Sequence, residues 1–257
     1  MNKTVLIVAG MAALLSLAAC APAGSQAEGS LTGKVWVMDS LNGAAPVPNT
    51  TITAEFTEDG KVGGSAGCNR YSGQYTVSGS NIEFKQSMAS TMMACDGPVM
   101  DQETAYFQAL AAAKSFAVGG DQLTLSDADG KELATYQAQS QSLEGTSWQV
   151  ISYNNGKQAV VSVVAGSELT ADFGTDGKLT GSAGCNNYNG EYKVDGNKIT
   201  IGPLASTMMF CNDPAGVMDQ ESQFLAALQS AATYKLEGNR LELRTADDAL
   251  AVDLQRK

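Results

Sequence analysis

Two ten-residue stretches of the chain are close copies, GSAGCNRYSG at residues 64–73 and GSAGCNNYNG at residues 181–190. Each is followed by a second shared stretch, ASTMMAC at 89–95 and ASTMMFC at 205–211. Glycine supplies backbone conformations and close approaches that other residues resist. A glycine-rich segment that recurs together with a downstream cysteine therefore indicates a duplicated structural unit.

The duplication extends over most of the chain. Trp36 corresponds to Trp148, and the offset between the copies grows from 112 to 118 residues along the sequence. Such a period is too long for a solenoid repeat and suits two tandem domains. We predict a first domain over residues 31–137 and a second over residues 143–257, with a short polar linker between them.

Short strands are expected in each copy. Runs of β-branched, aromatic or alternating residues define them in the first copy, at 34–41, 51–56, 73–78, 81–84 and 122–126. Turn signals rich in glycine and aspartate separate these runs. We therefore expect an α+β fold that is mostly β, with two tandem domains, each an antiparallel meander or partial barrel packed on one helix.

One amphipathic helix is expected in each copy, after Pro98 in the first and after Pro214 in the second. Its apolar face contains residues at helical spacing in both copies. These residues are Met100, Phe107, Leu110, Met218, Leu225 and Leu228, with Tyr106 and Phe224 widening the face. We expect this face to be buried, so that the helix covers the open side of the sheet.

Glu103 and Glu221 lie on the apolar face of these helices. A buried carboxylate is costly unless it is hydrogen-bonded, so each glutamate needs donors nearby. We expect these from the glycine-rich turns, whose characteristic residues are Gly67, Asn69, Gly184 and Asn186. The alternative role is a general acid or base, but no second repeated carboxylate or nucleophile accompanies either glutamate.

The cysteines predict disulfides. Cys68, Cys95, Cys185 and Cys211 fall in pairs, one pair in each copy. Of three connectivities, only Cys68–Cys95 with Cys185–Cys211 keeps the copies equivalent in an oxidising compartment. Each bridge closes a loop of about 27 residues, which contributes roughly 3–4 kcal/mol. The chain has no histidine and no C-x-x-C motif, so a zinc site is disfavoured.

The first 20 residues predict a lipoprotein signal peptide. A short uncharged apolar run follows Lys3 and is too short for a comfortable membrane span. It ends in LAAC at residues 17–20, which resembles the lipobox of bacterial lipoproteins and implies lipid attachment at Cys20. Residues 21–30 are small and polar, as in a flexible tether. Ala21 in place of aspartate favours the outer membrane, facing the periplasm, by resemblance to enterobacterial sorting rules.

Charge and composition exclude several classes of function. The net charge is −11, and no run of Lys or Arg exists, so a nucleic-acid partner is disfavoured. The absence of histidine removes Ser-His-Asp and Cys-His catalytic machinery. We expect no enzymatic activity and no cofactor.

At these motifs the chain resembles the META/HslJ family. The resemblance rests on a tryptophan in the first strand, a G-x-A-G-C-N turn followed by Y-x-G-x-Y, then T-x-M-A-C and an acidic helix start. In this chain the motifs lie at Trp36, 65–69, 71–75, 91–95 and 101–110, and again at Trp148, 182–186, 188–192, 207–211 and 219–228. Phe210 replaces the alanine in the second copy.

The resemblance implies small β-rich domains with a helix, found in envelope or secreted proteins. One member of the family is induced by heat shock and linked to novobiocin resistance, and the family has no established enzymatic activity. We therefore expect a non-enzymatic envelope lipoprotein with a structural or stress-protective role, whose partner is the membrane through its lipid anchor.

Three alternatives stay open. The first is a protein-binding module, such as an inhibitor of an envelope-attacking hydrolase, because small disulfide-pinned β domains present rigid loops at low entropic cost. The second is acid–base catalysis by Glu103 or Glu221. The third is copper(I) binding through methionine thioethers. Those methionines are Met92, Met93, Met208 and Met209. Adjacent residues of a strand point to opposite faces, so we expect no metal site.

Overall fold

The structure is a computed structural model that describes residues 29–85 and 87–257. The predicted signal peptide over residues 1–20, the lipidation site Cys20 and most of the tether at 21–30 lie outside the described residues. No helix within the described part of the chain is long and apolar enough to cross a membrane.

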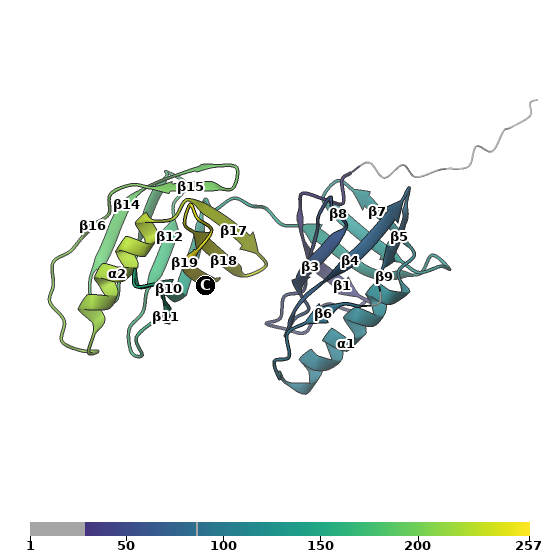
Figure 1. Cartoon of the computed structure of the whole chain (residues 1–257), viewed down its shortest axis with the longest axis horizontal. Coiled ribbons are helices and arrows are strands. Elements are labelled where there is room, and N and C mark those ends of the chain that lie inside the picture. The colour runs from purple at the N-terminus through teal and green to yellow at the C-terminus, as the bar shows by residue number, and fades with distance from the viewer. Residues whose placement is uncertain (1–28, 86) are drawn as a thin grey trace, which may run out of the picture.

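The first domain is a closed antiparallel barrel with one helix (Figure 1). Around the barrel the strands run β3-β2-β1-β9-β8-β7-β5-β4, and β4 pairs with β3 to close the circle. A short strand, β6, also pairs with β4 and is not part of the closed circle. The elements are β1 (Val35–Leu41), β2 (Thr53–Phe56), β3 (Lys61–Ser65), β4 (Arg70–Ser78), β5 (Asn81–Phe84), β6 (Ala89–Ser90), α1 (Gly97–Ala112), β7 (Ser115–Gly119), β8 (Gln122–Ser126) and β9 (Glu132–Ala138).

The second domain repeats this barrel. Its strands run β10-β12-β13-β14-β15-β17-β18-β19, closed by β10 on β19, with β11 added to β10 and β16 added to β14. The elements are β10 (Thr146–Asn154), β11 (Val160–Ser162), β12 (Thr170–Phe173), β13 (Lys178–Ser182), β14 (Asn187–Asp195), β15 (Lys198–Ile201), β16 (Ala205–Ser206), α2 (Val217–Gln229), β17 (Thr233–Glu237), β18 (Arg240–Arg244) and β19 (Leu250–Arg256).

The predicted fold class is confirmed: each domain is mostly β with one helix, and the two occur in tandem. The barrels close completely because strands β3, β7 and β9, which the residue pattern did not indicate, complete the circle. The sequence of β3, KVGGS, has low intrinsic strand preference, yet it pairs with β2 on one side and β4 on the other. Pairing on both sides overrides local preference here.

The glycine-rich segments are not wholly turns, which corrects the prediction. Gly64 lies on β3 and Gly73 on β4, so only residues 66–69 form the turn. A side chain at Gly64 would collide with the backbone carbonyl of Thr53 on the neighbouring strand. Gly64 thus permits close packing of strands, and Gly73 makes room for the Met88 side chain. Gly67, with a φ of +103°, provides the turn itself.

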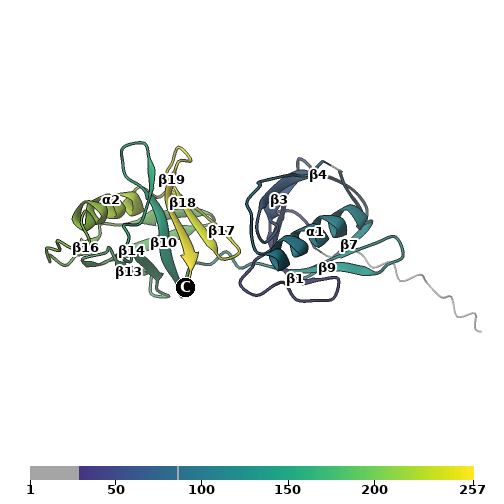
Figure 2. The same cartoon turned by 90° about the horizontal axis from the view of Figure 1, so that it is seen from below.

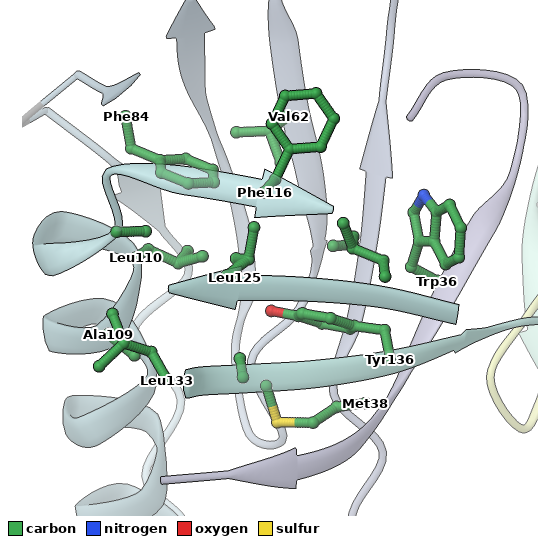
Figure 3. Close-up of a cluster of buried hydrophobic side chains, with 14 of the residues drawn as sticks. Trp36, Met38, Val62, Phe84, Ala109, Leu110, Phe116, Leu125, Leu133 and Tyr136 are labelled. Atoms are coloured by element: carbon green, nitrogen blue, oxygen red, sulfur yellow. The ribbon is translucent and has the colours of Figure 1, made fainter. Parts of the chain in front are cut away.

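In Figure 2, α1 crosses in front of its barrel, and buried side chains of each helix form part of the core of its domain. Leu110 and Ala109 from the helix belong to the first core together with Tyr136, Trp36 and other side chains of the strands (Figure 3). The predicted helix face is rotated slightly. Tyr106 is completely buried, while Met100 and Phe107 are only half-buried. The second helix is alike, with Phe224 buried and Met218 and Leu225 half-buried.

The two domains contact one another through the β17–β18 hairpin of the second domain. Glu237 accepts hydrogen bonds from Arg70 Nη2 (2.9 Å) and from Thr53 Oγ1 (2.8 Å) of the first domain. Lys235 forms an ion pair with Glu55 at 2.5 Å. In the linker, the Gln139 side chain binds both the N–H and the carbonyl of Gly238, each at 2.7 Å.

Candidate functional site

The most unusual surface of each domain is formed by the segment that follows its short strand, β6 in the first domain and β16 in the second. We call residues 91–95 the first methionine loop and residues 207–211 the second. Met92 and Met208 are each 98% exposed, and Met93 and Met209 are more than half exposed. Most of the large exposed apolar side chains among the described residues belong to these two loops, including Phe210. A concentration of exposed apolar side chains marks a candidate interaction site.

Asn69 holds the backbone of the first loop. Its Oδ1 accepts hydrogen bonds from the Met93 N–H (2.7 Å) and from Thr91 Oγ1 (2.8 Å). Its Nδ2 donates to the Met93 carbonyl (3.3 Å) and to Glu103 Oε1 (3.0 Å). The amide side chain therefore uses both of its acceptor positions and both of its donors. This arrangement fixes the loop backbone to the interior of the domain.

Glu103 secures that asparagine from the helix. Its Oε2 accepts the backbone N–H of Asn69 at 2.8 Å, and its Oε1 accepts the side-chain amide. Glu103 is 6% exposed and Asn69 is 2% exposed. A carboxylate buried to this degree persists when charge-assisted bonds such as these satisfy it. The two residues thus form one buried unit that joins α1, the glycine turn and the loop.

The second domain reproduces this unit. Asn186 binds Met209 N–H at 2.7 Å and Glu221 Oε1 at 3.0 Å, and its own N–H donates to Glu221 Oε2 at 2.9 Å. Its Oδ1 also accepts from Thr207 Oγ1 at 2.7 Å. Corresponding bonds in the two copies differ in length by 0.3 Å or less. The duplicated sequence therefore produces a duplicated hydrogen-bond network.

Both disulfides form within a domain, Cys68–Cys95 and Cys185–Cys211. Each bridge joins the glycine turn to the end of its methionine loop. The loop is consequently held at two points, by the asparagine near its middle and by the cysteine at its end. A loop tethered in this way loses little conformational freedom when it binds a partner.

We call the glycine turn, the methionine loop and the helix start of each domain its loop corner. Gln102 and Gln220 also contribute to this corner, and the sequence did not predict a role for them. Gln102 accepts the Val47 N–H at 2.5 Å and donates to Thr50 Oγ1 at 3.0 Å, which fixes the connection between β1 and β2. Gln220 makes the corresponding bonds to Val164 and Ser167. The signal was present in the repeated Asp-Gln-Glu sequence at the start of each helix.

A chain of buried hydroxyls distinguishes the core of the first domain. Tyr106 Oη lies 2.7 Å from Tyr71 Oη and 3.4 Å from Tyr136 Oη, and Tyr71 also donates to the Thr53 carbonyl. Burial raises the pKa of Tyr71 and Tyr106 well above the usual tyrosine value, and burial raises that of Tyr136 as well. These phenols therefore stay neutral and serve as structural hydrogen-bonding groups.

An open cavity of about 360 Å³ lies between the two domains. The charged side chains that line it are paired with one another, Arg70 with Glu237 and Arg240 with Asp253. Among the described residues, no group of three or more His, Cys, Asp or Glu side chains is placed to hold a metal ion. The methionine loops are thus the stronger candidate site.

Comparison with known proteins supports the duplication. The family model of the META domain matches the chain twice, over residues 29–140 and 141–257. None of the curated proteins matches the chain.

Solved structures similar to one domain's length of the chain include an NMR structure of a protein from Burkholderia xenovorans. It is 23% identical, with a TM-score of 0.38, and the match covers 45% of this chain and 83% of that one. Another is the crystal structure of a DUF4847 family protein from Bacteroides vulgatus. It is 17% identical, with a TM-score of 0.34, and the match covers 43% of this chain and 92% of that one.

Proposed function

Because the chain belongs to the META domain family and carries two copies of the domain, we propose that it is a non-enzymatic lipoprotein of the bacterial envelope that binds basic, apolar polypeptide segments. The lipid on Cys20 anchors it, in the outer membrane facing the periplasm. Its role is protective: it covers or sequesters such segments under envelope stress. The methionine loops are the binding elements.

The observation that carries this proposal is the contrast between backbone and side chain in the loops. Within each methionine pair, the asparagine binds only main-chain atoms, the N–H and carbonyl of Met93 in the first domain and those of Met209 in the second. The methionine side chains themselves point into solvent. The need to hold the loop backbone in place explains the repeated asparagine, glutamate, glycine and cysteine. It does not explain why both copies present a Met-Met pair, and a shared binding role accounts for that identity.

Charge indicates the chemistry of the partner. Acidic residues follow each loop, and all of them are exposed. They are Asp96 and Asp101 in the first domain and Asp213 and Asp219 in the second. The nearby Arg70 is engaged by Glu237. Flexible, polarisable methionines beside an acidic rim suit an apolar segment flanked by Lys or Arg. The overall charge of −11 favours the same class of partner.

The glutamates support a binding role over catalysis. Both oxygens of Glu103 are occupied by Asn69, and both oxygens of Glu221 by Asn186. A general acid or base needs its reacting oxygen within reach of a substrate proton. These carboxylates instead face the interior of their own domain, so we assign them to positioning the loops.

The test is binding of the full chain to a synthetic amphipathic helix made of leucine and lysine. We expect saturable binding, and no binding of the same helix with glutamate in place of lysine. Met92→Ser and Met208→Ser each weaken it by about tenfold, because one buried apolar side chain contributes roughly 1.5 kcal/mol.

The matched controls are Val77→Ser and Val194→Ser. These valines occupy corresponding exposed positions on β4 and β14, 45% and 41% exposed, away from the loops. Their replacement leaves the affinity unchanged. Equal weakening by the valine and methionine substitutions, or equal binding of the lysine and glutamate helices, contradicts the proposal.

A further inference from the structure

The methionine loops also carry the most exposed methionines of the described residues. Met92 and Met208 are each 98% exposed, whereas Met38 in the first core is 6% exposed. Met100 and Met218, at the helix starts, are half-buried. Reaction of a thioether with a dissolved oxidant requires access to the sulfur, so exposure ranks these residues by expected rate.

No free thiol competes with them in the described part of the chain. Cys68, Cys95, Cys185 and Cys211 are all consumed in disulfides. Thiolates are ordinarily the first sulfur groups to react with a two-electron oxidant. With those groups oxidised already, the exposed thioethers are the most reactive remaining sulfurs.

We propose that Met92 and Met208 are reversible oxidation sites at which a hydroperoxide converts the thioether to a sulfoxide. The sulfur lone pair attacks one peroxide oxygen, a sulfur–oxygen bond forms, and the oxygen–oxygen bond breaks. Sulfur loses two electrons, and the second oxygen takes the proton of the first and leaves as water from hydrogen peroxide, or as an alcohol from an organic hydroperoxide. A dithiol reductase reverses the step: two thiols become a disulfide, and the sulfoxide oxygen departs as water.

The local structure allows this modification without destabilising the fold. Asn69 holds the loop through the backbone of Met93, and the disulfide at Cys95 holds its end, so no stabilising bond involves the thioether of Met92. A sulfoxide at Met92 therefore changes the surface from apolar to polar without loosening the domain. The same change at a core methionine disrupts packing.

A regulatory consequence follows, and it rests on the function proposed above. A polar, chiral sulfoxide in place of Met92 and Met208 removes the apolar surface that a bound segment contacts. Oxidised protein then releases its partner, and reductase treatment restores binding. The loops would thus report an oxidising challenge through their own chemistry.

The first experiment is a timed hydrogen peroxide treatment of the full chain, followed by peptide mapping with fragmentation to separate Met92 from Met93. We expect Met92 and Met208 to oxidise at least about tenfold faster than Met38. The unfolding midpoint should not change while only these two are oxidised. Met92→Leu and Met208→Leu each remove one fast site. Faster reaction at Met100 or Met218, or unfolding in step with oxidation of Met92, overturns the proposal.

The second experiment separates this proposal from the proposed function. The affinity for the leucine–lysine helix is measured before oxidation, after it, and after a methionine sulfoxide reductase with dithiol. Selective oxidation with no binding of the helix by either form contradicts the proposed function and leaves the oxidation sites standing. Binding that is unaltered by full oxidation of Met92 and Met208 refutes the regulatory consequence.

Discussion

The two domains agree closely at their loop corners and differ in their cores and outer faces. At the corner, Asn69 and Asn186 make the same set of hydrogen bonds with the same partners. In the core, the Tyr106 position is occupied by Phe224, and the Tyr136 position, opposite the first strand, by Leu254. The two copies have therefore exchanged some core side chains while keeping the hydrogen bonds that present the methionine loops.

The surface that joins the domains differs as well. Arg70, which binds Glu237 across the interface, corresponds to Asn187 in the second domain. Glu237 itself corresponds to Gly119 in the first domain. The arginine of this pair thus occurs only in the first domain, and the glutamate only in the second. The hairpin of the second domain can therefore bind the first domain, whereas the corresponding hairpin of the first domain cannot bind the second in the same way.

The largest expected effect is loss of a disulfide. Replacing Cys68 and Cys95 by alanine should destabilise the first domain by roughly 3–4 kcal/mol, because the unfolded chain gains the freedom of the opened loop. Replacing Cys185 and Cys211 should have the same effect on the second, since the loops span 27 and 26 residues.

Denaturant unfolding measures this domain by domain if one tryptophan is kept. Trp36 and Trp148 are fully buried, one in each barrel, so a Trp→Phe background leaves fluorescence from a single domain. A difference of more than about 1 kcal/mol between the two domains would show that the corners are not equivalent.

The next largest effect concerns the buried carboxylates. Glu103→Gln and Glu221→Gln keep one acceptor oxygen but place an amide NH₂ against the other N–H group of the asparagine, so each variant should lose about 2–3 kcal/mol. Thermal unfolding in the single-tryptophan backgrounds provides the measurement. Glu58→Gln, at an exposed turn, is the control and should change stability by less than about 0.5 kcal/mol. Near-neutral results for both buried variants would refute the role assigned to the glutamates.

A smaller effect should appear in one domain only. Tyr106→Phe leaves the buried Tyr136 hydroxyl without its partner and should destabilise the first domain by about 1–2 kcal/mol. Adding Tyr136→Phe should recover part of that loss, because both hydroxyls are then absent, as in the second domain. A double-mutant cycle from denaturant unfolding tests the coupling. Strict additivity of the two substitutions would mean that the hydroxyl chain is not a unit.

The smallest effect concerns the contact between the domains. Arg70→Ala should cost less than about 1 kcal/mol, since the arginine is partly exposed, yet it should loosen the relative orientation of the domains. Residual dipolar couplings of the two domains should fit one alignment tensor in the wild type and two in the variant. Asn187→Ala, at the corresponding position of the second domain, is the control and should leave a single tensor.

The same contact should depend on pH. Burial alone would raise the pKa of Glu237, but the hydrogen bond and charge of Arg70, with help from Thr53 and Lys235, outweigh burial and lower it. A lowered pKa in the folded state means that the contact is fully present above the ordinary glutamate pKa, about 4.3. The contact is lost as the pH falls from there through the lower pKa of folded Glu237. Dipolar couplings recorded from neutral pH down through this interval should show the transition, and Glu237→Gln should abolish it.

The sequence predicts those parts of the molecule whose physical causes are local or repeated. Glu103 stands on the apolar side of a helix, so its need for buried donors follows from helical periodicity alone. The disulfides follow from the symmetry of the two copies. Gly64 was misplaced in a turn because its closest constraint, the Thr53 carbonyl, lies on another strand. The pair Arg70–Glu237 joins residues 167 apart and occurs once, so neither spacing nor repetition points to it.

The local sequence pattern also does not predict that the methionine loops are exposed. Apolar residues in a short strand-like run ordinarily indicate burial, and here the backbone is bound inward while the side chains are left outside. That inversion arises from Asn69, which lies in another segment and recognises main-chain atoms.

A corner that recognises main-chain atoms tolerates change at the side chains it displays. Ala94 and Phe210 already differ between otherwise matching loops, and the surrounding bonds are the same. New residues at positions 92–94 or 208–210 should therefore alter the displayed chemistry at little thermodynamic cost. Evolution, or a designer with a combinatorial library, has two ready-made graft sites on one scaffold, each open to independent diversification.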